Sequence, residues 1–355
     1  MSARIALASA AMMLTAVTAF AQRPADAAAK APPSLVVGKP APALTIDKWV
    51  KGAPVASFEK NKTYVVEFWA TWCGPCIAGM PHLSTLQREY KDKGVTIIGV
   101  TSLDKNNPLT AVEAMVKDKG DGMDYTVAWD PDRKTNEAYM KAAQRGGIPC
   151  SFVVDGTGTI VYIGHPMYLD PVMEQVVAGK WDVEKGNAWI KDAETKMNGI
   201  YNAMSKEPQS AAAKISEFEA AFPVYANLVS PMKFDALLAV GDYEGASKAG
   251  AKLVDEAIAH KNTADLNRYA WAIVDPQKNY EKRDLDLALR AAEKAVAFTS
   301  EKDAAILDTL ARVWFLKGDF KKAVEWQTKA AAVASEGMKK DIEATLAEYK
   351  AKNVQ

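Results

Sequence analysis

Two of the three cysteines in this 355-residue chain stand close together, as Cys73 and Cys76, with Gly74 and Pro75 between them. A strand-like run ends just before Cys73 and a helical run follows it, so Cys73 is predicted at a helix N-terminus. Free backbone N–H groups and the positive end of the helix dipole favour an anion there, and the thiolate is the reactive form of cysteine. We therefore expect Cys73 to attack a partner disulfide and Cys76 to resolve the mixed disulfide.

A CxxC pair also occurs in zinc sites and in heme-attachment motifs. A zinc site needs further ligands, and the chain offers only Cys150 and three histidines, His82, His165 and His260, with no second CxxC. Heme attachment needs a histidine directly after the second cysteine, where this chain has Ile77. We expect neither a metal nor another cofactor at the dithiol.

The longer segment VEFWATWCGPC, residues 66–76, resembles the active-site signature of the thioredoxin superfamily, and more narrowly that of exported TlpA/ResA-type thiol–disulfide oxidoreductases. Pro81 matches the proline that kinks the active-site helix of that family. Gly147-Ile148-Pro149 resembles its cis-proline loop. The resemblance covers about residues 35–183 and implies an α/β thioredoxin-like domain, a mixed sheet with flanking helices.

The resemblance also implies roles for residues around the dithiol. Glu67 falls where the family keeps a buried carboxylate. Desolvation raises the pKa of such a group, which makes Glu67 a candidate to accept the Cys76 proton during resolution. The alternative is a strand-end glutamate that faces solvent. Pro149 is expected to present the backbone of Ile148 to an extended partner chain.

Cys150, directly after that proline, departs from the family, which often has threonine or another small residue there. The resemblance places its sulfur near the dithiol. We interpret Cys150 as a buried, inert residue; the alternatives are an accessory thiol that forms other disulfides and a ligand for a soft metal such as copper(I). Trp72, Gly74 and Pro75 are expected to shape the site.

The first 21 residues are predicted to be a secretory signal peptide. Arg4 gives a basic start, residues 5–20 are apolar, and Ala19-Phe20-Ala21 fits an A-x-A cleavage site. We expect a periplasmic or secreted protein, with residues 22–34 as a flexible linker. A retained membrane anchor is the alternative, although the apolar run of 16 residues is short for a bilayer.

Residues 35–183 alternate strand and helix patterns, whereas residues 184–355 show helical spacing only. Gly241-Asp242-Tyr243 before Ala246 matches Gly318-Asp319-Phe320 before Ala323, so the second region resembles a tetratricopeptide-like repeat domain; a plain helical bundle is the alternative. The predicted strands are 63–69, 95–101, 125–128, 151–154 and 159–163, and the predicted helices of the first domain are 74–90 (interrupted at Pro81), 108–119, 136–143 and 170–178.

The charge balance, 44 basic against 44 acidic residues, gives no basic field for nucleic acid. The expected partners are proteins with disulfides or dithiols, an upstream electron donor, for which a membrane-borne protein is one candidate, and a protein bound by the helical domain. Gly-Pro between the cysteines resembles reducing thioredoxins and favours a disulfide reductase. Two alternatives are an adaptor whose helices recruit a client and a peroxidase of thioredoxin fold; the second is discounted because Thr71 is out of register with the peroxidase motif.

Overall fold

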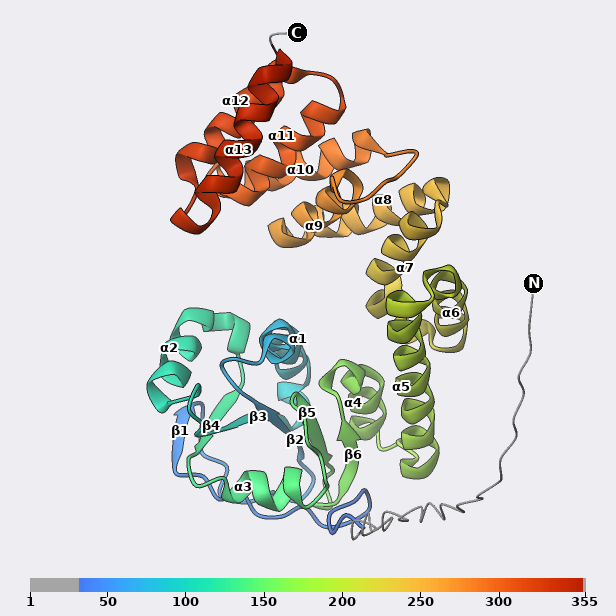
Figure 1. The fold of residues 1–355 in the computed structure, drawn as a ribbon. Helices are drawn as coiled ribbons and strands as arrows, with labels where there is room; N and C mark the ends of the chain where they lie inside the picture. The colour runs from blue at the N-terminus through green and yellow to red at the C-terminus, as the bar shows by residue number, and fades with distance from the viewer. Residues whose placement is uncertain (1–31, 354–355) are drawn as a thin grey trace, which may run out of the picture.

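The computed structural model describes residues 32–353, so the predicted signal peptide and most of the predicted linker lie outside the described residues. The described part contains a mixed α/β region followed by an all-helical region (Figure 1). Within residues 32–353, none of the helices is both long and apolar enough to cross a membrane.

The α/β region is built on one six-stranded sheet with the order β1-β4-β3-β2-β5-β6. Its strands are β1 (Lys48–Lys51), β2 (Thr63–Trp69), β3 (Val95–Ser102), β4 (Thr126–Asp130), β5 (Cys150–Val154) and β6 (Ile160–Gly164). The parallel strands β2, β3 and β4 form the centre, while β1, β5 and β6 pair antiparallel. β2 is buried along its whole length, as its β-branched and aromatic sequence predicts.

Helices cover both faces of this sheet. The first face carries α1 (Gly74–Tyr90), α2 (Leu109–Lys119) and α4 (Leu169–Val177), whose apolar side chains pack on Val65 and Trp69 of β2. The second face carries Val66 and Phe68, and it is covered by the residues around α3 (Lys134–Asn136) and by the π-helix η3 (Glu137–Lys141). Short 3-10 helices complete the region at Lys91–Lys93, Gly120–Met123 and Pro166–Tyr168.

The predicted fold class is confirmed, with local corrections. The sequence pattern missed β1, a short, lysine-flanked edge strand that is stabilised by pairing with β4. The predicted interruption at Pro81 is wrong, since α1 is continuous through this residue. The strand predicted at 125–128 is Thr126–Asp130, and the helix predicted at 136–143 begins at Lys134 and becomes π-helical.

The helical region runs from α5 to α13. Its helices are α5 (Val183–Lys206), α6 (Pro208–Ala221), α7 (Ala226–Val240), α8 (Tyr243–Ala259), α9 (Thr263–Val274), α10 (Leu285–Thr299), α11 (Ala304–Leu316), α12 (Phe320–Val333) and α13 (Glu336–Asn353), with a 3-10 turn at Pro223–Tyr225. Gly241 and Gly318 end helices in the left-handed region, and the aspartates that follow, Asp242 and Asp319, cap the next helices through their side chains. The repeated Gly-Asp pair therefore marks two similar turns.

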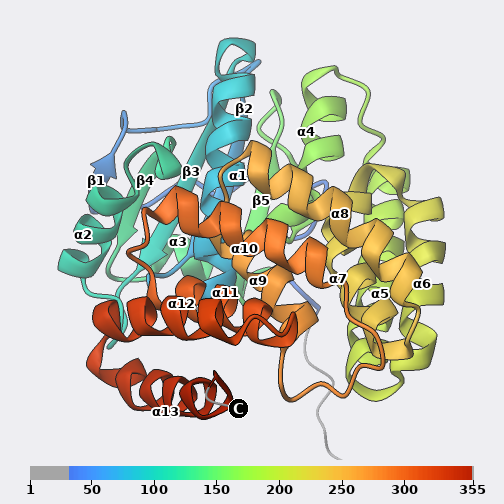
Figure 2. The same cartoon turned by 90° about the horizontal axis from the view of Figure 1, so that it is seen from above.

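The first helices of this region are packed on the α/β region. The Trp181 and Asn187 side chains donate hydrogen bonds to the carbonyl oxygen of Val161 in β6, at 3.1 and 2.8 Å. Tyr225 donates to the carbonyl oxygen of Tyr168 at 3.1 Å, and one apolar cluster continues from β2 into α7. Helices α8–α13 have a core of their own and lie over the α1 side of the sheet (Figures 1 and 2).

Candidate active site

The two clustered cysteines form a disulfide at the N-terminus of α1. Cys73 is the N-cap residue, and its sulfur accepts a hydrogen bond from the backbone N–H of Cys76 at 3.2 Å. No acidic residue lies in the first turn of α1, so the positive helix end faces no competing carboxylate there. The same N–H and dipole would stabilise a Cys73 thiolate after reduction, which is the state that attacks disulfides.

The turn before Cys73 is fixed by a residue that the sequence analysis missed. Asn107 is completely buried, and its side-chain oxygen accepts hydrogen bonds from the backbone N–H and the hydroxyl of Thr71, at 2.9 and 2.7 Å. The amide nitrogen of Asn107 donates to Thr101 and to the carbonyl oxygen of Ser102. The turn is thereby tied to the end of β3. An asparagine in a loop carries no sequence signal for this role without knowledge of the contact.

Glu67 lies on the same face of β2 as Val65 and Trp69, under α1. It pairs with Gly99 of β3 and with Ser151 of β5, and it is 2% exposed. Desolvation by burial raises the pKa of its carboxyl to about 8. The alternative of a solvent-facing glutamate is therefore wrong, because the Glu67 side chain is buried in the core of the sheet.

Several polar atoms surround this carboxyl in an otherwise apolar core. Trp69 Nε1, the Tyr125 hydroxyl and the Ser151 hydroxyl are buried without a hydrogen-bond partner in the described chain. A Cβ at Gly99 would lie 2.9 Å from the Tyr125 ring and 3.0 Å from Trp69 Nε1. The missing side chain at Gly99 thus leaves room for polar groups that can respond to the charge of Glu67.

The loop before β5 and the residue before the dithiol border the site. The Ile148–Pro149 peptide bond is cis; Pro149 is buried and Ile148 is half-buried. Trp72 is 54% exposed, and its indole N–H donates to Asp104 Oδ2 at 2.8 Å. Trp72 was expected to shape the site, and about half of its surface faces solvent. Asp104 was missed because it belongs to a loop after β3.

Cys150 does not share the side of the sheet that carries the dithiol. It pairs with Phe68, and its side chain packs in the second core cluster with Phe68, Tyr139 and Met140, opposite α1. The expectation that its sulfur lies beside the disulfide is therefore wrong. The thiol is free, and burial raises its pKa to about 12; a raised pKa disfavours the thiolate, which is the reactive form of cysteine.

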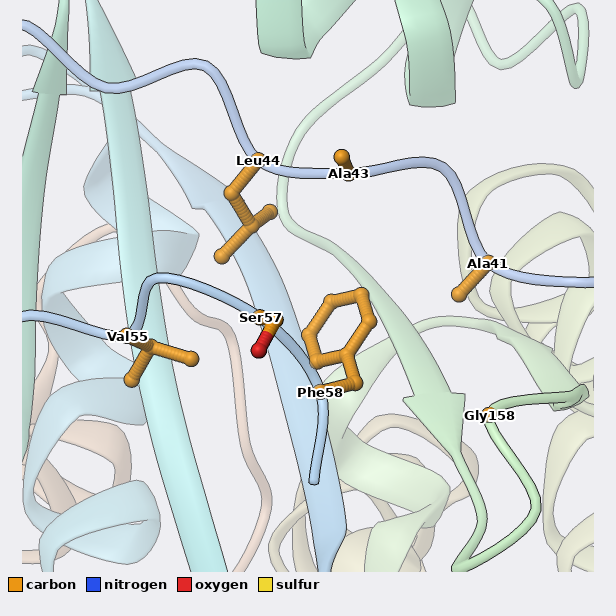
Figure 3. Close-up of a pocket in the computed structure, with 7 residues that line it drawn as sticks. All are labelled: Ala41, Ala43, Leu44, Val55, Ser57, Phe58 and Gly158. Atoms are coloured by element: carbon orange, nitrogen blue, oxygen red, sulfur yellow. The ribbon is translucent and has the colours of Figure 1, made fainter. Parts of the chain in front are cut away.

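One pocket away from the dithiol offers little chemistry. The pocket in Figure 3, of about 240 Å³, is lined by Leu44, Val55 and Phe58 among other residues, with Ser57 as its polar side chain and no titratable group. Within residues 32–353, no group of three or more His, Cys, Asp or Glu side chains is arranged to hold a metal ion. The Cys73–Cys76 disulfide, on the face of β2 that carries Glu67, is therefore the candidate active site.

Comparison with known proteins gives the same assignment. Residues 36–176 match the Redoxin family. The chain is 30% identical over 152 residues to Protein FixW of Rhizobium leguminosarum, covering 42% of this chain and 69% of that protein. It is 32% identical over 153 residues to the thiol:disulfide interchange protein HelX of Rhodobacter capsulatus, covering 42% and 77%. It is 33% identical over 126 residues to the thiol-disulfide oxidoreductase ResA of Bacillus anthracis, covering 35% and 67%. With a CxxC disulfide in place at the start of α1, the chain belongs to the thioredoxin-like thiol–disulfide oxidoreductases of the ResA, FixW and HelX type.

Proposed function

We propose that this protein reduces disulfides of partner proteins outside the cytoplasm. The observation that carries the proposal is the Cys73–Cys76 pair at the α1 N-terminus, which packs on the face of β2 that also carries the buried carboxyl of Glu67. The names of HelX and ResA describe interchange between thiols and disulfides, and we extend that activity to this chain. The predicted signal peptide supports the compartment, in which reduced dithiols must be regenerated by a separate electron donor.

In the proposed reaction the enzyme starts as a dithiol. The Cys73 thiolate attacks one sulfur of the partner disulfide, a bond forms between Cys73 and that sulfur, and the other partner sulfur leaves as a thiolate that takes up a proton. The Cys76 thiolate then attacks Cys73 Sγ and releases the second partner thiolate, which is also protonated. The partner gains two electrons and two protons, and the enzyme becomes the disulfide seen here.

Glu67 is proposed as the base for the second step. Cys76 is 4% exposed and must lose its proton before it can attack. A carboxyl with a pKa of about 8 is matched to a thiol in this task, because general bases work best near the operating pH. Ionised Glu67 would accept the Cys76 proton, which moves the negative charge from the carboxylate to the Cys76 thiolate. The unpaired N–H of Trp69 and hydroxyl of Tyr125 would respond to this change in charge.

The cis-proline loop is proposed to hold the partner. Pro149 ends the loop at the dithiol, and Ile148 carries the backbone groups that an extended chain would bind, as an added strand does. Trp72, Gly74 and Pro75 complete the rim. We further propose residues 35–183 and 184–355 as the two functional units, the second of which recruits a partner through tetratricopeptide-like helices.

The direct test is to trap the mixed disulfide. A Cys76→Ser variant lacks the resolving thiol, so partner proteins should remain linked to Cys73 and be identified by mass spectrometry. The matched control is Cys150→Ser in the same background, which should trap the same partners because Cys150 lies on the opposite face of the sheet. Trapped partners that depend on Cys150, or no trapped partner at all, would refute the proposal.

The adaptor role of the helical region rests on the two matching turns at Gly241-Asp242 and Gly318-Asp319. Truncation at residue 184 is a poor test, because α5–α7 share the core of the α/β region. A photo-crosslinker at exposed Val333 in α12 should capture a partner also trapped by Cys76→Ser, while one at exposed Val224 serves as the control. Equal capture at both positions would contradict a specific surface on the later helices.

A further inference from the structure

A pocket of about 460 Å³ adjoins the dithiol on the face of the sheet opposite α1. Ala70 and Trp72 border it on the side of the cysteines, and Gly147 and Ile148 border it on the side of the cis-proline. The volume lies within the range of protein ligand pockets. The pocket therefore lies between residues next to the dithiol and the loop of the cis-proline.

The wall opposite Trp72 has unusual backbone. η3 is a π-helix, a form that occurs often at functional sites. Arg133, just before α3, and Gln144, after η3, both have left-handed φ angles, of 60° and 53°, although neither is a glycine. Such conformations carry strain and collect at functional sites. Arg133 lines the pocket itself, and Gln144 directly precedes the lining residue Arg145.

The pocket combines a buried apolar floor with a charged rim, in which three basic side chains outnumber two acidic ones: Arg133, Lys141 and Arg145 against Asp104 and Glu137. Phe68 and Met140 form part of the floor, and Trp72 at the edge is 54% exposed. Ser102, also in the lining, has a buried hydroxyl without a hydrogen-bond partner in the described chain. An apolar side chain fits the floor, and a polar ligand group would satisfy that hydroxyl.

Two arginines of the rim keep donors for an anion. Arg133 donates to the side-chain oxygen of Asn136 at 3.0 Å, and Arg145 donates to the carbonyl oxygen of Ile163 at 3.1 Å, so each binds a neutral acceptor. Arg133 interacts electrostatically with Asp130, and Arg145 with Glu194. Neither carboxylate forms an ion pair with its arginine in the described structure.

Of the other rim charges, Lys141 and Glu137 compensate each other in an ion pair, whereas the hydrogen-bond partner of Asp104 is neutral. Lys141 pairs with Glu137 at 3.1 Å, and Asp104 accepts from Trp72. An incoming carboxylate therefore finds Arg133 and Arg145 as its partners, and the forked guanidinium suits a carboxylate.

We propose that this pocket is the specificity subsite for the partner disulfide, and that it selects partners with an apolar residue and acidic residues next to the attacked cysteine. This inference rests on the proposed reductase function and names its substrate class. The apolar side chain occupies the floor formed by Phe68 and Met140, and the carboxylates lie against Arg133 and Arg145. Trp72 covers the junction with the dithiol.

The test uses the full chain in its reduced form and three disulfide-linked peptides that differ only after the cysteine, as Cys-Leu-Glu-Glu, Cys-Leu-Gln-Gln and Cys-Leu-Lys-Lys. At low salt we expect kcat/KM about fivefold higher for the acidic than for the basic peptide, a size set by a few partly screened ion pairs. Salt at 0.5 M should bring the ratio near one. The double variant Arg133→Glu/Arg145→Glu should invert the preference.

Two further variants protect the interpretation. Arg133→Gln/Arg145→Gln keeps similar side chains without charge and should bring the acidic-to-basic ratio near one. Lys39→Glu/Lys60→Glu makes the same charge change as the reversal, but both lysines lie at the opposite end of the sheet, beside β6 and before β2. This control should keep the wild-type ratio.

The outcomes separate the two proposals. Equal rates for the three peptides with the wild-type chain, or a ratio that moves with Lys39 and Lys60, would overturn the subsite while the reductase function stands. If the wild-type chain reduces neither the peptides nor neutral bis(2-hydroxyethyl) disulfide, the reductase function fails, and the subsite falls with it.

Discussion

The α/β region and the helical region of this chain bury different kinds of side chain. Among the described residues, all buried polar or charged side chains except Thr309 and Gln327 lie before residue 184. All buried alanines except Ala70 and Ala128 lie after it. Buried polar groups are expensive unless they are satisfied, and small residues allow close helix packing. The α/β region thus buries polar side chains, among them Glu67 of the candidate active site, whereas the helical region buries small side chains that let its helices pack closely.

The largest effect should come from the nucleophile. Cys73→Ser should lower the rate of insulin reduction at least about a thousandfold, because Cys73 is the cysteine at the N-cap of α1 and the free thiol of Cys150 is buried. Cys150→Ser is the control and should retain the wild-type rate. A Cys73→Ser protein that still turns over would show that the chemistry does not belong to the α1 N-terminus.

The next effect concerns the buried carboxyl. Folded Glu67 keeps its proton up to about pH 8, whereas in the unfolded chain it ionises near its model value of 4.5. The folded state holds more protons in this window, so stability falls as pH rises from 4.5 to 8 and levels off above it. The total is up to about 5 kcal/mol.

Glu67→Gln should therefore unfold at nearly constant denaturant concentration across this window, while the oxidised wild type weakens. The same variant should slow the release of the mixed disulfide and flatten the pH profile of disulfide reduction. If wild type and variant have parallel pH curves of stability, the pKa of Glu67 is not raised by folding. If their pH curves of rate are also parallel, Glu67 is not the base.

A change in the helical region should affect stability without affecting the chemistry. Ala288 is completely buried in α10, and Ala288→Leu should lower the free energy of unfolding by about 1–3 kcal/mol through overpacking. Reduction of a small peptide disulfide should stay unchanged. If that rate drops together with stability, the apolar cluster around Ala288 is more tightly coupled to the α/β region than its separation from that core indicates.

The smallest effect belongs to the surface of the same region. Lys317 of the α11–α12 turn pairs with Asp286 of α10, whose side chain is 90% exposed. Asp286→Ala should change the free energy of unfolding by less than about 1 kcal/mol, because exposed ion pairs contribute little. Urea denaturation of the wild type and the variant measures this change. A loss of several kcal/mol would mean that Asp286 stabilises the fold far more than an exposed ion pair does.

The local sequence predicted the α/β pattern, the reactive pair and the buried glutamate, because each depends on short-range spacing around one strand and one helix. It did not predict which face of the sheet Cys150 occupies. That property follows from the register of β5 on β2, in which Cys150 opposes Phe68 and Ser151 opposes Glu67.

The contacts that position the dithiol could not be predicted from the sequence either. Asn107 and Asp104 lie more than thirty residues after the turn they support, and only the β2–β3 pairing brings them to Thr71 and Trp72. The edge strand β1 could not be predicted for a related reason. Its four residues include two lysines, and they form a strand by pairing with β4.

The most direct test of the account is a single turnover of the reduced full chain with one equivalent of a disulfide peptide, read by mass spectrometry after alkylation. We predict that one peptide disulfide is reduced per chain, that Cys73 and Cys76 become linked with the loss of two hydrogens, and that Cys150 is still alkylated after unfolding. Consumption of Cys150, or a reduced peptide without the Cys73–Cys76 bond, would contradict it.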